Sequence, residues 1–230
     1  MMSESVEDTL TFLANVGYKE VEPAGLYGYS PERFGQLLTD LKLRAPSSHV
    51  GIPDGKDAQQ RVFEDARAIG QKWVTDPYFG GGSIDAYKRF AEKLNEAGAR
   101  ARHHGLRVAY HNHAGEFTEM DGKIPYFVLL DETDPQLVDF ELDTYWAVAG
   151  GMKPVDIFRR SPGRFPLTHI KDMGADGSMV TVGDGIIDFG NIFAHKSLAG
   201  FHHHFVEHDN PSEPEEFARE SYQFLRNLTF

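Results

Sequence analysis

The chain has 230 residues, of which 40% are hydrophobic and 25% are charged, and these proportions fit one globular domain. Its 23 lysines and arginines stand against 35 aspartates and glutamates, and this net charge of −12 disfavours nucleic acids and anionic lipid surfaces as partners. The absence of cysteine excludes disulfides and thiolate metal sites. No apolar run approaches the roughly 18 residues of a membrane span. The acidic start, with Glu4, Glu7 and Asp8, is unlike a secretory signal, so we expect a cytoplasmic protein.

Helical and strand patterns alternate along the whole chain. Helices are predicted over residues 6–16, 31–41, 57–69, 84–104, 126–132, 155–161, 187–198 and 214–227. Strands are predicted over residues 18–24, 43–50, 72–76, 106–111, 137–143, 166–171 and 201–207. Repeated strand–helix units of this length predict an α/β domain with a parallel sheet.

Histidine and carboxylate side chains recur where the predicted strands end. They are Glu22, His49, His111, His113, Asp143, His169 and Glu207. In a (β/α)8 barrel the carboxyl ends of the strands meet at one face, where active sites lie. We therefore predict a barrel rather than a flat, doubly wound sheet, with residues 1–230 as its single domain. Only seven strands are visible, whereas a closed barrel has eight.

This mixture of histidine and carboxylate predicts a site for a divalent metal ion. Asp143 is the most informative member, because a buried carboxylate in a strand needs a partner. A metal ion that contacts two neighbouring oxygens of a polyol makes the carbon-bound proton between them more acidic. The tract His202–His204 does not offer three joint ligands, because successive strand residues point to opposite faces. The sequence therefore predicts a metal-dependent enzyme with a sugar or polyol substrate.

Six segments in chain order carry a resemblance to a known family. They are GYKEVEPAG (17–25), AYHNHAGEF (109–117), FELDTYW (140–146), HIKDM (169–173), VGDGIIDF (182–189) and FVEHD (205–209). With them the chain resembles the sugar phosphate isomerase/epimerase family of xylose isomerase-like barrels, and in particular its Tyr-His-Asn-His subgroup. The resemblance covers nearly the whole chain and implies a fold, but it does not specify a substrate.

The resemblance also implies roles for single residues. One divalent ion is expected on His111, Asp143, His169 and Glu207, where His111 takes a position that is glutamate in many relatives. Because a neutral histidine replaces a carboxylate there, we expect Mn, Co, Fe or Zn rather than Mg. Glu207 is the expected base, and His113 is the second catalytic group. Substrate contacts are expected from Glu22, His49, Glu116, Trp146 and Lys171.

The chain departs from the family at its start. The family begins with a strand, whereas this chain begins at the helix that follows that strand. Since the first and last strands pair in a closed barrel, we expect an unpaired edge beside Glu22 and Glu207. A truncated chain, an open barrel and a barrel closed by a partner all remain alternatives, and so does a homo-oligomer.

The leading functional hypothesis is isomerisation or epimerisation of a sugar by proton abstraction next to a carbonyl. A keto-sugar lyase or dehydratase, such as inosose dehydratase or a 3-keto-glycoside lyase, starts with the same abstraction and is the alternative. A non-catalytic, degenerate barrel is a further alternative, supported by the missing strand and by His111. A DNA repair function like that of endonuclease IV is disfavoured by the net charge of −12.

Overall fold

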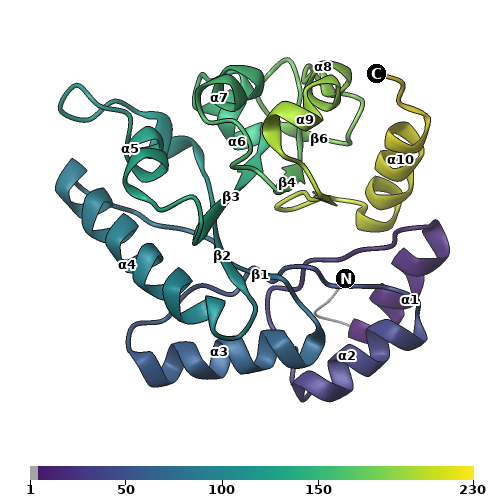
Figure 1. Cartoon of the computed structure of the whole chain (residues 1–230). Coiled ribbons are helices and arrows are strands. Elements are labelled where there is room, and N and C mark those ends of the chain that lie inside the picture. The colour runs from purple at the N-terminus through teal and green to yellow at the C-terminus, as the bar shows by residue number, and fades with distance from the viewer. Residues whose placement is uncertain (1–4) are drawn as a thin grey trace.

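The computed structural model describes residues 5–230, and in it helices surround a curled parallel sheet (Figure 1). The helices are α1 (Val6–Val16), α2 (Pro31–Asp40), α3 (Lys56–Ile69), α4 (Ile84–Arg102), α5 (Pro125–Glu132), α6 (Thr144–Ala149), α7 (Pro154–Arg160), α8 (Phe189–Ala194), α9 (Lys196–Ala199) and α10 (Pro214–Asn227). A 3-10 helix, η1, spans Ala114–Phe117. No helix within residues 5–230 has the length and apolarity needed to cross a membrane.

The sheet has five parallel strands in the order β1-β2-β3-β4-β7. They are β1 (Trp73–Asp76), β2 (Arg107–His111), β3 (Val138–Asp143), β4 (Leu167–Ile170) and β7 (His203–Val206). The first two predicted strands are extended segments that continue the sheet through single parallel bridges, Glu20 to Arg44 and His49 to Thr75. Pro23 and Pro46 lie in these segments, and a proline has no N–H with which to extend a ladder. The predicted parallel α/β barrel, with its seven segments in chain order, is confirmed.

Besides the 3-10 helix η1, three features were not predicted from the sequence. Strands β5 (Asp172–Met173) and β6 (Met179–Val180) form a small antiparallel hairpin beyond β4. Helix α6 begins directly after β3, because the Asp143 carboxylate accepts a hydrogen bond from the Trp146 N–H and caps the helix. The helix predicted over residues 187–198 is divided into α8 and α9 at His195.

The two faces of the sheet carry different kinds of side chain. Outward-facing strand residues such as Val108, Phe140 and Ile170 join the helices in one large hydrophobic cluster. Inside the barrel, only a small separate cluster is apolar: Trp73, Ala109, Leu167 and Phe205. We call this cluster the floor of the barrel. Because strand side chains alternate between faces, the residues nearer the carboxyl ends of the strands also point into the barrel, and most of them are polar. The barrel interior is therefore a polar chamber on an apolar floor.

The backbone of the barrel is not closed. Strand β7 pairs only with β4, and within residues 5–230 no ladder joins it to the segment 18–24. The unpaired edge expected beside Glu22 and Glu207 is thus confirmed; the part of that prediction that concerns residues 1–4 lies outside the described residues. We call this gap the seam.

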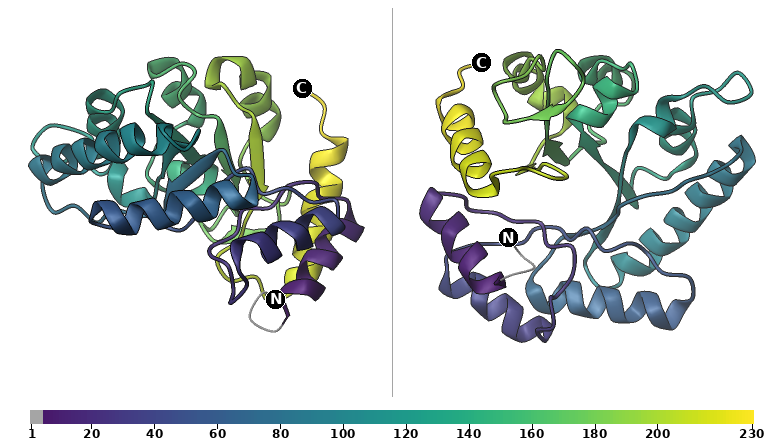
Figure 2. Two further views of the ribbon diagram at one scale, coloured as in Figure 1. Left: turned by 60° about the horizontal axis from the view of Figure 1, so that its bottom comes forward. Right: turned by 180° about the vertical axis from the view of Figure 1, so that it is seen from behind.

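Helices close the seam on the outside. Figure 2 shows α10 beside α1, and the two helices are in contact. The Tyr18 hydroxyl donates a hydrogen bond to the Ala218 carbonyl at 2.9 Å, and the rings of Tyr18 and Tyr222 lie 5.1 Å apart. Gly17, which ends α1 with φ of 125°, leaves room for the Tyr222 ring.

We predict that Gly17→Ala destabilises the protein far more than Gly70→Ala. Both glycines have positive φ, so both substitutions strain the backbone by about 1–2 kcal/mol. Only at Gly17 would the new methyl group also overlap a side chain, that of Tyr222, whereas nothing lies near it at Gly70. Urea unfolding should give a total loss of roughly 2–5 kcal/mol for Gly17→Ala. Equal losses in the two variants would show that α1 and α10 do not pack as described.

Candidate metal centre and active site

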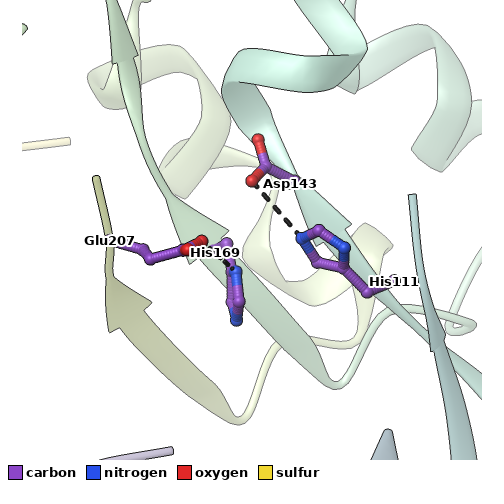
Figure 3. A group of neighbouring side chains, drawn as sticks. All are labelled: His111, Asp143, His169 and Glu207. Carbon is purple, nitrogen blue, oxygen red and sulfur yellow. Dashed lines mark hydrogen bonds and ion pairs between the residues drawn. The ribbon is translucent and has the colours of Figure 1, made fainter. Parts of the chain in front are cut away.

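Four of the predicted ligands meet at the carboxyl ends of neighbouring strands. His111 and Asp143 end β2 and β3, His169 lies in β4, and Glu207 directly follows β7 (Figure 3). Asp143 is the register partner of His169, so the pairing of β3 with β4 sets these two side chains next to each other. Each of the four offers one ligand atom, and these atoms lie within 4.8 Å of one another.

Three of the four side chains are almost completely buried. His111, Asp143 and His169 are 2%, 0% and 3% exposed, whereas Glu207 is 36% exposed. The His111 Nε2 atom lies 3.4 Å from an Asp143 oxygen, and the His169 Nδ1 atom lies 2.7 Å from Glu207. Glu207 therefore forms the solvent-accessible side of the cluster.

Asp143 is fixed by its surroundings. Its Oδ1 atom accepts the Trp146 N–H at 2.8 Å, which leaves Oδ2 free to face His111. Its own N–H donates to the Asn112 side chain at 3.0 Å. The strand end, the helix cap and Asn112 together give this ligand one orientation.

Lys171 brings a positive charge to the same place. Its ammonium group lies 3.1 Å from Asp143, 2.9 Å from Glu207 and 2.7 Å from Asp209. Burial opposes its charge, but the carboxylates of Asp143, Glu207 and Asp209 raise the pKa of Lys171 above its ordinary value. The side chain is therefore an ammonium ion near neutral pH.

At the other edge of the His169 ring, the Nε2 atom contacts two more carboxyl groups. This atom lies 2.8 Å from Glu22 and 3.3 Å from Glu141. Sequence reasoning did not select Glu141, although Asp139, Glu141 and Asp143 alternate along β3 and so share its inner face. Burial and the neighbouring Glu22 carboxylate raise the pKa of Glu141 well above its usual range. For Glu22, burial is outweighed by the hydrogen bond from His169, and its pKa is lowered.

The other two imidazoles beside His169 are neutral. Burial, together with the positive charge of His169, lowers the pKa of His49 to about 3. Burial and the positive charge of His169 hold the pKa of His111 well below its ordinary value. The rings of His49 and His111 lie 4.7 Å apart. A neutral imidazole is the form that binds a metal ion, so His111 suits the ligand role.

His113 lies at the edge of the cluster, between two aromatic rings. Its centroid is 5.3 Å from that of Tyr78 and 5.4 Å from that of Trp146. Its Nδ1 atom is buried and has no hydrogen-bond partner within the described chain. Burial lowers the pKa of His113, so the ring is neutral near neutral pH. A neutral imidazole is the form that can accept a proton.

Glu116 has a different environment from the one expected for a substrate contact. Its carboxylate accepts hydrogen bonds from the Tyr110 hydroxyl and from the His113 N–H, and the side chain is buried. Both oxygens thus have partners within the chain, an arrangement that favours a role in holding the His113 backbone.

The histidine tract separates as its alternation predicts. His203 binds Glu20 at 2.7 Å, and the ring of His204 packs against Phe193 and Phe201. None of the three tract residues belongs to a ligand cluster among residues 5–230.

The donor set fits a divalent ion that accepts both nitrogen and oxygen. His111 and His169 offer nitrogen, Asp143 and Glu207 offer oxygen, and this mixture suits Zn, Mn, Co or Fe. Three of the four are held almost completely out of solvent by the strands that carry them.

The comparisons with known proteins agree with this geometry. The model of the xylose isomerase-like TIM barrel family matches residues 10–228. The chain belongs to this family. A sugar phosphate isomerase/epimerase from Parabacteroides distasonis, known from a crystal structure, is 27% identical, with a TM-score of 0.82 and coverage of 98% of this chain and 89% of that one.

Inosose dehydratases are among the relatives in this barrel family. The one from Geobacillus kaustophilus is 31% identical over 231 residues, which cover 82% of this chain and 74% of that protein. The one from Lacticaseibacillus casei is 32% identical over 135 residues, 51% of this chain. With that relative and several others, the match spans only about half of the relative's length (45%, 54% and 42%).

We predict that Asp143→Asn abolishes tight metal binding, whereas Asp139→Asn does not change it. Both aspartates lie on the inner face of β3, but Asp139 binds Arg107 and Trp73 at the floor. In chelator competition, Asp143→Asn should lose more than the roughly 10–100-fold typical of residues behind a ligand. Asp139→Asn should instead lose about 1–3 kcal/mol of stability. Equal metal affinity in wild type and Asp143→Asn would place the ion elsewhere.

We also predict that metal binding releases a proton and strengthens as the pH rises. Burial disfavours the charged ring of His169, but Glu141, Glu207 and Glu22 outweigh it and raise the pKa of His169 well above its ordinary value. A ring that ligates a metal ion must give up that proton. Affinity should therefore rise up to about tenfold per pH unit below the pKa of His169. Calorimetry in buffers of different ionisation enthalpy counts the protons released, and a count of zero would contradict this protonation state.

Proposed function

We propose that the chain removes a proton next to the carbonyl group of a keto-sugar or keto-polyol, and that loss of water from the neighbouring carbon completes the reaction. The observation that carries the proposal is the convergence of His111, Asp143, His169 and Glu207, with His113 and Lys171 at the edge of the cluster. The inosose dehydratases among the relatives favour the elimination step.

A divalent ion held by those four residues would polarise the substrate carbonyl and stabilise the negative charge that forms on its oxygen. Lys171 adds a permanent positive charge on the same side, 2.9 Å from Glu207. Its ring contact with Trp146, 5.6 Å from ammonium nitrogen to centroid, makes these two residues a wall of the site. We assign substrate contacts to Lys171, Trp146 and His49.

His113 is a better base than Glu207 in this geometry. Burial works against the Glu207 charge, but His169 and Lys171 donate hydrogen bonds to it and lower its pKa, which weakens it as a proton acceptor. His113 is neutral, and its ring lies 5.0 Å from that of His111. A base of this kind lies closer to the proton affinity that transfer at neutral pH requires. We therefore assign the base role to His113 and a ligand role to Glu207.

The proton balance closes without another reactant. His113 takes the proton from carbon, and the electron pair of the broken C–H bond moves into the carbonyl system as an enolate. The imidazolium that results returns its proton to the hydroxyl group on the next carbon. As the C–O bond breaks, that group leaves as water, a new C=C bond forms, and His113 is neutral again. No oxidant or reductant is needed.

Epimerisation or isomerisation is the second candidate. It shares the first proton abstraction, but the proton returns to carbon instead of to a leaving hydroxyl group. The Parabacteroides distasonis relative named as a sugar phosphate isomerase/epimerase supports it. His113 follows β2 and Glu207 follows β7, so proton carriers on both sides of the cluster are available for it.

The test uses purified protein with Mn, Co or Zn in heavy water and a panel of inososes, 3-keto-glucosides and ketohexoses. Proton NMR should show deuterium entering the carbon next to the carbonyl, followed by an unsaturated product. His113→Gln should lower exchange and turnover by about 100–10,000-fold while metal affinity stays unchanged. His104→Gln, a change outside the site, is the matched control.

Each alternative has its own signature in the same assay. Exchange with a rearranged sugar and no alkene would identify an epimerase or isomerase. Tight metal binding without exchange on any substrate would identify a non-catalytic barrel. Normal exchange in His113→Gln, together with loss of exchange but not of metal in Glu207→Gln, would return the base role to Glu207.

A further inference from the structure

We propose that Glu22 is a positioning residue: it holds the His169 ring through Nε2 so that Nδ1 faces the metal-binding side. This inference rests on the proposed metal site. It replaces the expectation that Glu22 contacts substrate.

The contact geometry separates the two nitrogens of His169. The Nδ1 atom faces Glu207, one of the four ligands, at 2.7 Å, and the Nε2 atom faces Glu22 at 2.8 Å. An imidazole that binds a metal ion through one nitrogen usually donates the N–H of the other to a carboxylate. That bond fixes the tautomer, the ring orientation and the basicity of the ligating nitrogen. Glu22 is placed to accept it.

Glu22 is held where it cannot turn to solvent. Its side chain is 3% exposed, and that of Glu141, which also lies beside Nε2, is completely buried. The remaining Glu22 oxygen, Oε1, has no hydrogen-bond partner within residues 5–230, and neither Glu141 oxygen has one. A buried carboxylate with a single good partner depends on that partner, so the contact with His169 also orients Glu22.

The same segment contains a natural comparison. Glu20 accepts a hydrogen bond from His203 Nδ1 at 2.7 Å, close in length to the contact between Glu22 and His169. The two glutamates are two residues apart on one extended segment, and each binds a histidine of a strand nearby. His203 lies outside the ligand cluster, so Glu20→Gln changes a glutamate–histidine contact of similar length, together with the Glu20 contact to Arg44, without touching the centre.

The experiment compares Glu22→Gln, Glu141→Gln and Glu20→Gln with wild type as full-length proteins. Co²⁺ and Zn²⁺ affinities come from chelator competition, metal stoichiometry from elemental analysis, and ligand geometry from the visible spectrum of bound Co²⁺. Thermal unfolding of the metal-free proteins reports folding. We expect Glu22→Gln to weaken metal binding by about 10–100-fold and to change the Co²⁺ spectrum. Glu20→Gln should keep both at wild-type values, whatever its effect on stability.

Glu141→Gln provides the second variant, should Glu22→Gln fail to fold. Because Glu141 lies farther from Nε2, at 3.3 Å, we expect a smaller loss of affinity in the same direction.

Three outcomes would overturn the proposal. One is a folded Glu22→Gln with wild-type affinity and spectrum. Another is an equal loss in Glu20→Gln, which would make the effect a general one on the barrel. The third is a second equivalent of metal in wild type that disappears in Glu22→Gln while the first keeps its affinity. Glu22, His49 and His169 would then be ligands of a second ion, as their proximity allows.

Failure of the proposed function gives a different pattern. If wild type binds metal and Glu22→Gln weakens it, but no substrate exchanges, the positioning role stands and the reaction does not. If wild type binds no divalent ion, both the positioning role of Glu22 and the proposed reaction are contradicted.

Discussion

The contact of one imidazole with carboxylates on both its nitrogens is the interaction on which the barrel interior depends. Glu22 lies in the first extended segment and Glu207 follows the last strand, so these residues flank the seam, where no backbone ladder joins the two edges. His169 lies between them, at 2.8 Å from one and 2.7 Å from the other. A charge-assisted hydrogen bond is stronger than a neutral one, and more so where water is excluded. At the level of the site, side chains therefore connect two edges that the backbone leaves apart.

The polar chamber follows from the same arrangement. Buried carboxylates need positive or hydrogen-bonding partners, and those available here are His169, Lys171 and the backbone N–H groups at the start of α6. Removing one partner would leave a charge without compensation, so the residues of the chamber depend on one another. Such a network is costly to keep for stability alone. Its presence at the carboxyl ends of the strands, with the Glu207 side chain about one third exposed, agrees with a site that acts on a small polar molecule.

Much of the fold and of the ligand set could be predicted from the sequence, because the carboxyl ends of the strands in a barrel lie at one face. His111, Asp143, His169 and Glu207 each stand at or near the carboxyl end of a strand, and in a barrel all such positions converge. The most instructive omission is Glu141, which lies inside a strand, where the general expectation of apolar residues concealed it. Only the period of two that it shares with Asp143 could have revealed it.

The roles of individual residues were less predictable, because they depend on the hydrogen bonds and charges around each side chain. Glu116 was expected at the substrate, but the turn of η1 directs it to Tyr110 and to the His113 backbone. Burial and neighbouring charges, which the sequence does not show, decide that Lys171 is an ammonium ion and that the His113 ring is neutral. The hairpin β5–β6 was missed for another reason: strands of two residues carry no periodic pattern.

The seam also has a consequence for how the ring assembles. The Tyr18 hydroxyl and the Ala218 carbonyl, which meet outside it, are 200 residues apart in the chain, whereas neighbouring strand–helix units contact one another locally. Contacts of such high order carry the largest loop-closure entropy, so the unit made of α1 and α10 belongs among the last to form and the first to open. A cavity of about 240 Å³ at the seam is lined by Glu22, His169 and Glu207. A ligand that contacts both Glu22 and Glu207 in this cavity would stabilise the closed arrangement of the first and last parts of the chain.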